Sequence, residues 1–160
     1  MNAPKIIELA LTGVLRDYGE LGADTNVRPW RSLRQAAKTL SRSLPCVDIR
    51  CASAQHNEDE ATQTCRCDIE IRTSGVDDES HELIAAVEES VRDTLERLYD
   101  QTKVSAGDEY AAFIASAAEE SSSLFILGGF TFDGGVSPYD DDDENVAAIT
   151  ITVHFAKAAG

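Results

Sequence analysis

The sequence predicts an α+β fold: a four-stranded antiparallel or mixed sheet, built from two hairpins, with helices packed on one face. Alternating apolar and polar residues run from Thr64 to Thr73 and again from Val146 to Ala156, a period typical of strands with one buried face. Between these strands, apolar residues recur every three or four positions from Asp77 to Tyr99, which indicates an amphipathic helix. Such a helix must pack on a flat apolar surface, and the preceding strand offers one.

The first of these strands and the helix after it form the unit around which the chain is organised. The buried strand face is predicted to consist of Cys65, Cys67, Ile69 and Ile71. Gly75 ends the strand, and acidic residues 77–79 then place negative charge at the positive end of the helix dipole. The apolar stripe of the helix consists of Leu83, Ile84, Val87, Val91, Leu95 and Leu98. We expect this stripe to pack on the buried strand face.

Towards the N-terminus, the pattern predicts two helices separated by a loop. The first helix is expected to begin near Pro4 and to end before Gly19. Residues 22–29 should form the loop, and residues 30–43 a second helix with basic outer faces. A strand over Cys46–Ala54 is then expected to place Val47, Ile49 and Cys51 on one side.

The connections on the C-terminal side carry more polar and glycine residues. Residues 55–63 are too long and polar for a tight turn, which predicts an exposed hairpin loop. Residues 107–120 predict an alanine-rich helix, and Leu124–Asp133 a strand bent at its two glycines. Residues 133–145 are predicted as a loop before the final strand.

Composition limits the classes of function. The chain has 160 residues, of which 29 are acidic and 14 basic, so its formal net charge is −15. This length suits a single domain, 1–160, with a helical N-terminal part (1–44) and a sheet-and-helix core (45–156). The negative charge disfavours sequence-independent binding to nucleic acid or anionic membranes.

No membrane or secretory segment is predicted. No apolar run approaches the roughly 20 residues of a membrane span. Glu8, Arg16 and Asp17 interrupt the N-terminal apolar stretch where a secretory signal would need continuity. We therefore expect a protein kept in the cytosol or in a particle assembled there.

The charges are unevenly distributed. One basic segment is a candidate subunit interface and contains Arg28, Arg31, Arg34, Lys38 and Arg42. Two acidic loops are candidates for lining a lumen or contacting a partner, and contain Glu58, Asp59, Glu60, Asp140, Asp141, Asp142, Asp143 and Glu144. The basic segment is either a solvated helix face or a patch that docks on the acidic surface of a neighbouring subunit.

The four cysteines do not have the spacing of a zinc site. Cys46 and Cys51 are five positions apart on one strand, so their side chains should point to opposite faces. A tetrahedral zinc site needs four convergent ligands. We expect Cys51, Cys65 and Cys67 to be small core residues, reduced and free of metal.

Other candidate chemistry is equally unspecific. The acidic run at residues 140–144 lacks the ligand alternation and central glycine of a calcium loop, which favours a solvated hairpin tip. His56, His81 and His154 have no recognisable nucleophile beside them in the sequence. The paired glycines form neither a phosphate-binding loop nor a dinucleotide fingerprint. We expect no enzyme activity and no cofactor.

The order of elements and the character of the loops resemble a known family. A leading helix precedes a strand with an acidic loop (residues 46–60), an alternating strand, an acid-started helix and an aromatic strand (130–133); an acidic insertion and a terminal alternating strand follow. Over residues 45–155 this arrangement resembles the tail terminator proteins, the minor tail proteins that cap the tail tube of long-tailed bacteriophages. The segment of residues 28–45 is longer and more basic than the family leads us to expect.

The resemblance implies a structural virion protein. It implies a homo-oligomeric ring, expected to be a hexamer, at the head-proximal end of the tail, in contact with the tail tube protein and the head–tail connector. DNA would pass through the ring without specific binding. The alternatives are another neck or tail-completion adaptor, a cytosolic bacterial interaction module, or an enzyme whose site is assembled only in space.

Overall fold

The structure is a computed structural model with three helices and six strands in the part of the chain that it describes, namely residues 3–30, 44–52, 55–56, 62–120, 125–141 and 143–157. The helices are α1 (Ala3–Tyr18), α3 (Glu82–Val104) and α4 (Asp108–Glu120). The strands are β1 (Asn26–Pro29), β2 (Cys46–Cys51), β3 (Gln55–His56), β4 (Thr62–Ser74), β5 (Phe125–Asp141) and β6 (Glu144–Lys157).

The strands form one mixed sheet in the order β1-β2-β4-β6-β5, with β3 paired to the start of β4. The expected hairpins, β2–β4 and β5–β6, are present, and β4 pairs with β6 to join them. The α+β class is therefore confirmed, but the sheet has six strands rather than four. The additional strands, β1 and β3, are too short to show a periodic pattern in the sequence.

Strand β1 corrects the prediction for the N-terminal part. Helix α1 ends at Tyr18, as expected, but residues 26–29 form a strand parallel to β2 instead of part of a loop. Of the side chains in β1, Val27 and Pro29 are buried. Residues 31–43, the body of the second predicted helix, lie outside the described residues.

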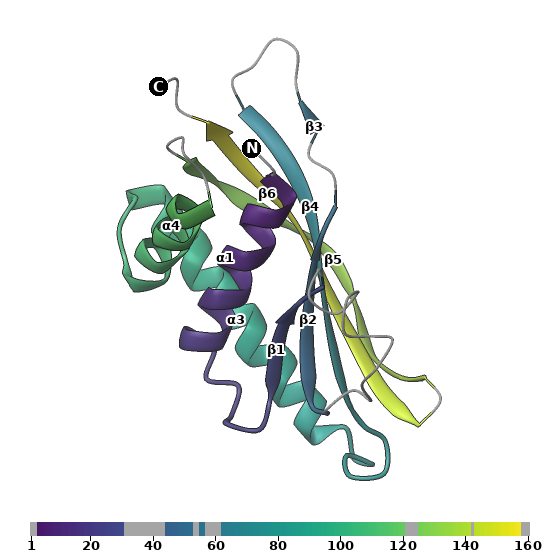
Figure 1. The fold of residues 1–160 in the computed structure, drawn as a ribbon. Coiled ribbons are helices and arrows are strands. Elements are labelled where there is room, and N and C mark those ends of the chain that lie inside the picture. The colour runs from purple at the N-terminus through teal and green to yellow at the C-terminus, as the bar shows by residue number, and fades with distance from the viewer. Residues whose placement is uncertain are drawn as a thin grey trace.

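The helices cover one face of the sheet (Figure 1). Helix α1 contacts β1, β2 and β4, and helix α3 contacts β4, β5 and β6. Helix α4 packs on both helices. The apolar stripe of α3 is buried together with the Cys65–Ile71 face of β4 in one core cluster, so the predicted packing is confirmed. Leu83 is the exception, because 43% of it remains exposed.

Strand β5 continues far beyond the predicted bend. Residues 133–141, predicted as loop, pair with β6 up to Asp141, which lies opposite Glu144. Three irregularities in register interrupt the pairing, one of them beside Gly129 and another beside Gly134. Both glycines have positive φ, so they form the bulges that let a strand absorb extra residues. The glycines and the proline that predicted a loop instead mark an irregular edge strand.

Candidate functional site

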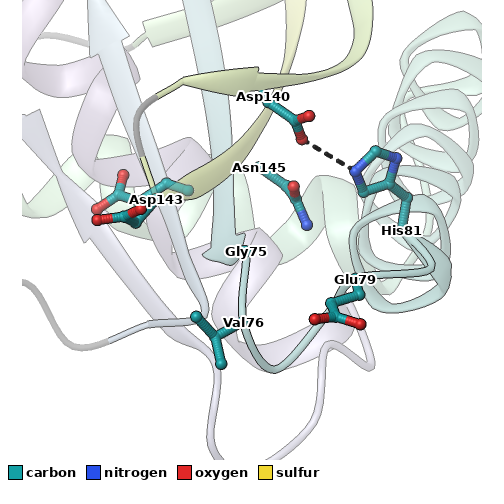
Figure 2. A pocket seen from close by; sticks show the side chains of 8 residues that line it. Gly75, Val76, Glu79, His81, Asp140, Asp143 and Asn145 are labelled. Carbon is teal, nitrogen blue, oxygen red and sulfur yellow. Dashed lines mark hydrogen bonds and ion pairs between the residues drawn. The ribbon is translucent and has the colours of Figure 1, made fainter.

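The acidic tip of the β5–β6 hairpin lies against the turn that leads from β4 into α3 (Figure 2). The Gly75 amide donates a hydrogen bond of 2.8 Å to the Asp143 carbonyl. A Cβ atom at Gly75 would lie only 2.8 Å from the same oxygen. A larger residue would therefore push the two backbones apart, and glycine at this position serves the close approach of the hairpin tip.

A buried polar cluster fixes this contact from the helix side of the sheet. Asp78, which is 4% exposed, accepts hydrogen bonds from the Leu83 amide at 2.9 Å and the Ile84 amide at 3.0 Å. Its carboxylate also accepts a hydrogen bond of 2.8 Å from Thr73. Asn145, at the start of β6, donates to the Asp78 carbonyl at 2.7 Å. The cluster thus joins β4, β6 and the first turn of α3.

The charge on Asp78 is well suited to this position. Burial alone would raise the pKa of Asp78, but hydrogen bonds from Leu83, Thr73 and Ile84 outweigh burial and hold its pKa below the usual value. Asp78 is one of the acidic residues predicted to lie at the start of the helix. It satisfies helix amides that would otherwise lack partners.

On the opposite face of the sheet, Arg72 forms ion pairs with three carboxylates. Its guanidinium lies 2.5 Å from Glu70, 2.9 Å from Glu144 and 3.2 Å from Asp141, and its side chain is 15% exposed. Burial alone would lower the pKa of Arg72, but hydrogen bonds to Glu70 and Glu144 outweigh burial and raise its pKa above the usual value. Two of these carboxylates belong to the hairpin tip, so Arg72 holds part of the acidic run against β4.

His81 makes a further contact with the tip. Its Nε2 atom lies 3.1 Å from Asp140, and both side chains are substantially exposed. The backbone of His81 is in the left-handed region, with φ 61°, directly before the first residue of α3. The hairpin tip therefore contacts the turn through backbone, buried and exposed groups at once.

Between tip and turn lies an open pocket of about 430 Å³. Acidic side chains predominate in its lining, together with His81 and Asn145; the lining residues are Gly75, Val76, Glu79, His81, Asp140, Asp143, Glu144 and Asn145. Chemically, this arrangement presents concentrated negative charge on a backbone that is held in place.

The predicted site residues have different outcomes. Asp140, Asp141 and Asp143 are exposed, and Glu144 is half-buried, all at this one end of the sheet. Asp142, Glu58, Asp59 and Glu60 lie outside the described residues, as do the basic residues Arg31, Arg34, Lys38 and Arg42.

Arg28 has a different environment from the one expected. It lies in strand β1, where its Nε atom contacts the buried carboxylate of Asp48 at 3.2 Å. Its Nη2 atom is buried and makes no hydrogen bond with the described residues. Arg28 therefore supports the pairing of β1 with β2 and lies in a strand rather than in the predicted loop.

Sequence reasoning missed the residues that hold the tip in place. Arg72 and Asn145 were treated as ordinary outward-facing or loop positions. The signal available was weak: one arginine at the end of an otherwise alternating strand, and one asparagine directly before an apolar strand. Their roles depend on the pairing of Arg72 with Val146 and of Thr73 with Asn145, a register that the sequence does not display.

The cysteines also differ from the expectation. Cys51 and Cys67 lie opposite each other on β2 and β4, with Cα atoms 4.2 Å apart, and form a disulfide. The expectation that all cysteines are reduced is wrong for this pair. Cys65 lies on the same face but is not part of the disulfide, whereas Cys46 is buried on the other face beside Asp48. The predicted opposite orientation of Cys46 and Cys51 thus agrees with the sheet.

Comparison with known proteins gave no assignment: no family model matches the sequence, and no curated protein matches it. Within the described residues, none of the helices is long and apolar enough to cross a membrane.

Proposed function

We propose that this protein is a structural subunit of the tail or neck of a long-tailed bacteriophage, resembling the tail terminators. In this proposal, copies of the chain form a ring, expected to be a hexamer, that caps the tail tube and joins it to the head–tail connector. The protein assembles in the host cytoplasm and remains in the virion. It performs no catalysis and requires no cofactor.

The observation that supports this function best is the fixed acidic end of the β5–β6 hairpin. Asp140, Asp141 and Asp143 are exposed, yet their strands are held by Arg72, His81 and the Gly75 amide. An acidic loop without a fixed conformation would only add solubility, whereas an anchored loop places its charge at a defined position. Carboxylates placed along a channel repel DNA phosphates, so DNA can pass without adhering.

The overall charge makes the choice of interface important. Subunits that each carry a net charge of −15 repel one another unless opposite charges meet where they touch. In a ring, each interface joins two different patches of the same chain. Arg31, Arg34, Lys38 and Arg42 remain the predicted basic patch, and an acidic surface of the next subunit is its predicted partner. Arg28, the fifth residue of this predicted patch, also pairs with Asp48 within the chain.

The first experiment measures assembly. Native mass spectrometry and light scattering of the purified protein should give a ring-sized species, and raised salt should weaken it by screening the charged contact. Mixed with the tail tube protein from the same virus, the ring should stop tube growth, which electron microscopy can measure as tube length. A protein that stays monomeric at all concentrations and leaves tube growth unchanged would contradict the proposal.

The second experiment tests the hairpin separately from assembly. The variant Asp140→Asn/Asp141→Asn/Asp143→Asn removes three exposed charges from the tip. The matched control Glu89→Gln/Asp93→Asn/Glu96→Gln removes three exposed charges from α3. If the tip lines the channel, the first ring should retain DNA in a fluorescence anisotropy assay, while the wild-type and control rings should not. Equal DNA retention by both variants would show that the tip does not line the channel.

A further inference from the structure

Three cysteine sulfurs converge in the core, well away from the acidic hairpin tip. The Sγ atoms of Cys51, Cys65 and Cys67 all lie within 4.8 Å of one another. Their residues are 5%, 1% and 0% exposed, respectively. They project from β2 and β4 towards the face of the sheet that the helices cover. The site is therefore a dry cluster of three soft donor atoms on two neighbouring strands.

In the structure the cluster is partly oxidised. Cys51 and Cys67 form the disulfide, and the Cys65 thiol lies beside them, outside the disulfide, with its sulfur 3.1 Å from the Ala52 carbonyl. A dithiol reductant cleaves the S–S bond by transferring two electrons and two protons, and becomes a disulfide itself. Reduction thus leaves three thiols at one point, each of which can lose its proton to become a thiolate ligand.

We propose that the reduced Cys51, Cys65 and Cys67 bind one soft monovalent cation, Cu⁺, through three sulfur atoms. Thiolates are the ligands that Cu⁺ prefers. With metal–sulfur bonds of about 2.3 Å, three sulfurs around one ion are about 4 Å apart. The observed separations, all within 4.8 Å, are compatible with this triangle after the disulfide opens.

The number of donors favours Cu⁺ over Zn²⁺. A structural zinc site uses four ligands, and a three-ligand zinc site keeps a position open to water. In the described part of the chain, the group that could hold a metal contains these three cysteines and no fourth donor. Glu8, a buried carboxylate on α1, contacts the Cys51 amide at 3.0 Å but does not belong to the group. Because burial also leaves little room for water, a three-coordinate ion fits best.

The chain provides its own matched control. Cys46 lies on the same strand as Cys51, is also buried, and faces the other side of the sheet beside Asp48. Replacing Cys46 removes a buried thiol without touching the cluster. Binding that depends on Cys65 but not on Cys46 would therefore identify the three-sulfur site rather than thiol content in general.

The experiment is an anaerobic titration of the full chain with Cu⁺. The protein is reduced with a dithiol, freed from it by gel filtration, and titrated in competition with a colorimetric Cu⁺ chelator. We expect one equivalent to bind in the wild type and in Cys46→Ser, and at least tenfold weaker binding in Cys65→Ser. Binding should weaken as pH falls, because protons compete with the cation for sulfur. Thermal melts establish that each variant is folded.

X-ray absorption of the wild-type complex makes the test independent of the variants. Three sulfur neighbours around copper are expected. Absence of a bound equivalent, fewer than three sulfur neighbours, or equal loss of binding in the Cys46 and Cys65 variants would overturn the proposal. Preferential binding of Zn²⁺ that is lost in Glu8→Gln would overturn it too, since it would reveal a four-ligand site that includes Glu8.

Discussion

The two ends of strand β4 lie in contrasting environments, although apolar and polar residues alternate in the same way along the whole strand. Near its start, Cys65 and Cys67 lie in the apolar core, and a disulfide links β4 to β2. Near its end, Arg72 and Thr73 take part in hydrogen bonds and ion pairs with the turn and the hairpin tip. Burial and a covalent bond stabilise the first end, while charge and hydrogen bonding stabilise the second.

The contrast shows that alternation defines which residues face the core, but not what holds each end of the strand. The cysteine end should respond to reductant and be indifferent to salt and moderate acid. The acidic end should respond to pH and salt and be indifferent to reductant. Each of the following changes tests this separation, starting with the region that both ends share.

The largest effect is expected at the centre, where α3 packs on the sheet. Leu95 is fully buried, so Leu95→Ala should lower the free energy of unfolding by about 2–5 kcal/mol through lost burial and the resulting cavity. Urea unfolding with and without salt measures this loss of unfolding free energy, and neither salt nor reductant should alter its size. The control Leu83→Ala, at a position that is 43% exposed, should cost much less. Equal losses would show that α3 is not docked by its buried stripe.

Reduction of the Cys51–Cys67 disulfide should have the next largest effect. A link that spans 16 residues restricts the unfolded chain, which by the loop-entropy relation is worth about 3 kcal/mol. Adding a dithiol in the absence of metal should therefore destabilise the wild type by about this amount. The variant Cys51→Ala, which lacks the link, should not respond to the dithiol. A wild type that is equally stable with and without dithiol would mean that the link is absent in solution.

Replacement of Asp78 should have a comparable or smaller effect at the acidic end. Asp78→Asn presents an amide to the Leu83 and Ile84 amides and removes the charge, so we expect a loss of roughly 2–3 kcal/mol near neutral pH. The neighbouring Asp77→Asn alters an exposed carboxylate and should change stability by less than about 0.5 kcal/mol.

The pH dependence of this loss follows from the lowered pKa of Asp78. The folded pKa lies below the unfolded value of about 3.9, so the charged side chain stabilises the fold above that pH. As pH falls through the folded pKa, the contribution disappears. The difference in stability between wild type and Asp78→Asn should thus be constant from roughly pH 6 to 8 and shrink below about pH 4. A difference that grows in acid would contradict the assignment.

Much of the fold follows from local pattern, because long elements repeat their period many times. Helix α1, the α3 stripe and the alternation in β4 and β6 each display several buried positions at regular spacing. The bounds of α1, β4 and β6 were predicted within two residues at each end, whereas α3 begins and ends five residues later than predicted. Strand β1 has only four residues and belongs to the sheet through parallel pairing with β2. Four residues carry too little pattern to predict such a pairing.

The candidate site could be predicted only in part, for a different reason. The acidic run is visible in the amino-acid composition. Its anchoring depends on contacts between residues distant in sequence, such as the ion pair of Arg72 with Asp141 and the hydrogen bond of Gly75 with Asp143. The strand that continues to Asp141 was missed because glycine and proline usually end strands. Here bulges accommodate them. The cysteine cluster was missed because the sequence argument required all four cysteines to converge, and Cys46 and Cys51 point to opposite faces. Three sulfurs converge without Cys46.

The smallest effect is expected at the exposed contact between His81 and Asp140. Their side chains are 39% and 77% exposed, so the pair should contribute about 0–1 kcal/mol, and raised salt should remove it. His81 also has a left-handed backbone, which costs an L-residue about 1 kcal/mol that glycine would not lose. His81→Gly should therefore leave stability nearly unchanged, since it loses the pair and relieves the backbone. In the Asp140→Asn background, where there is no pair to lose, the same His81→Gly change should stabilise the protein. A double-mutant cycle by urea unfolding at low and high salt separates these contributions, and a coupling above about 1 kcal/mol that persists at high salt would show that this contact is stronger than a surface ion pair.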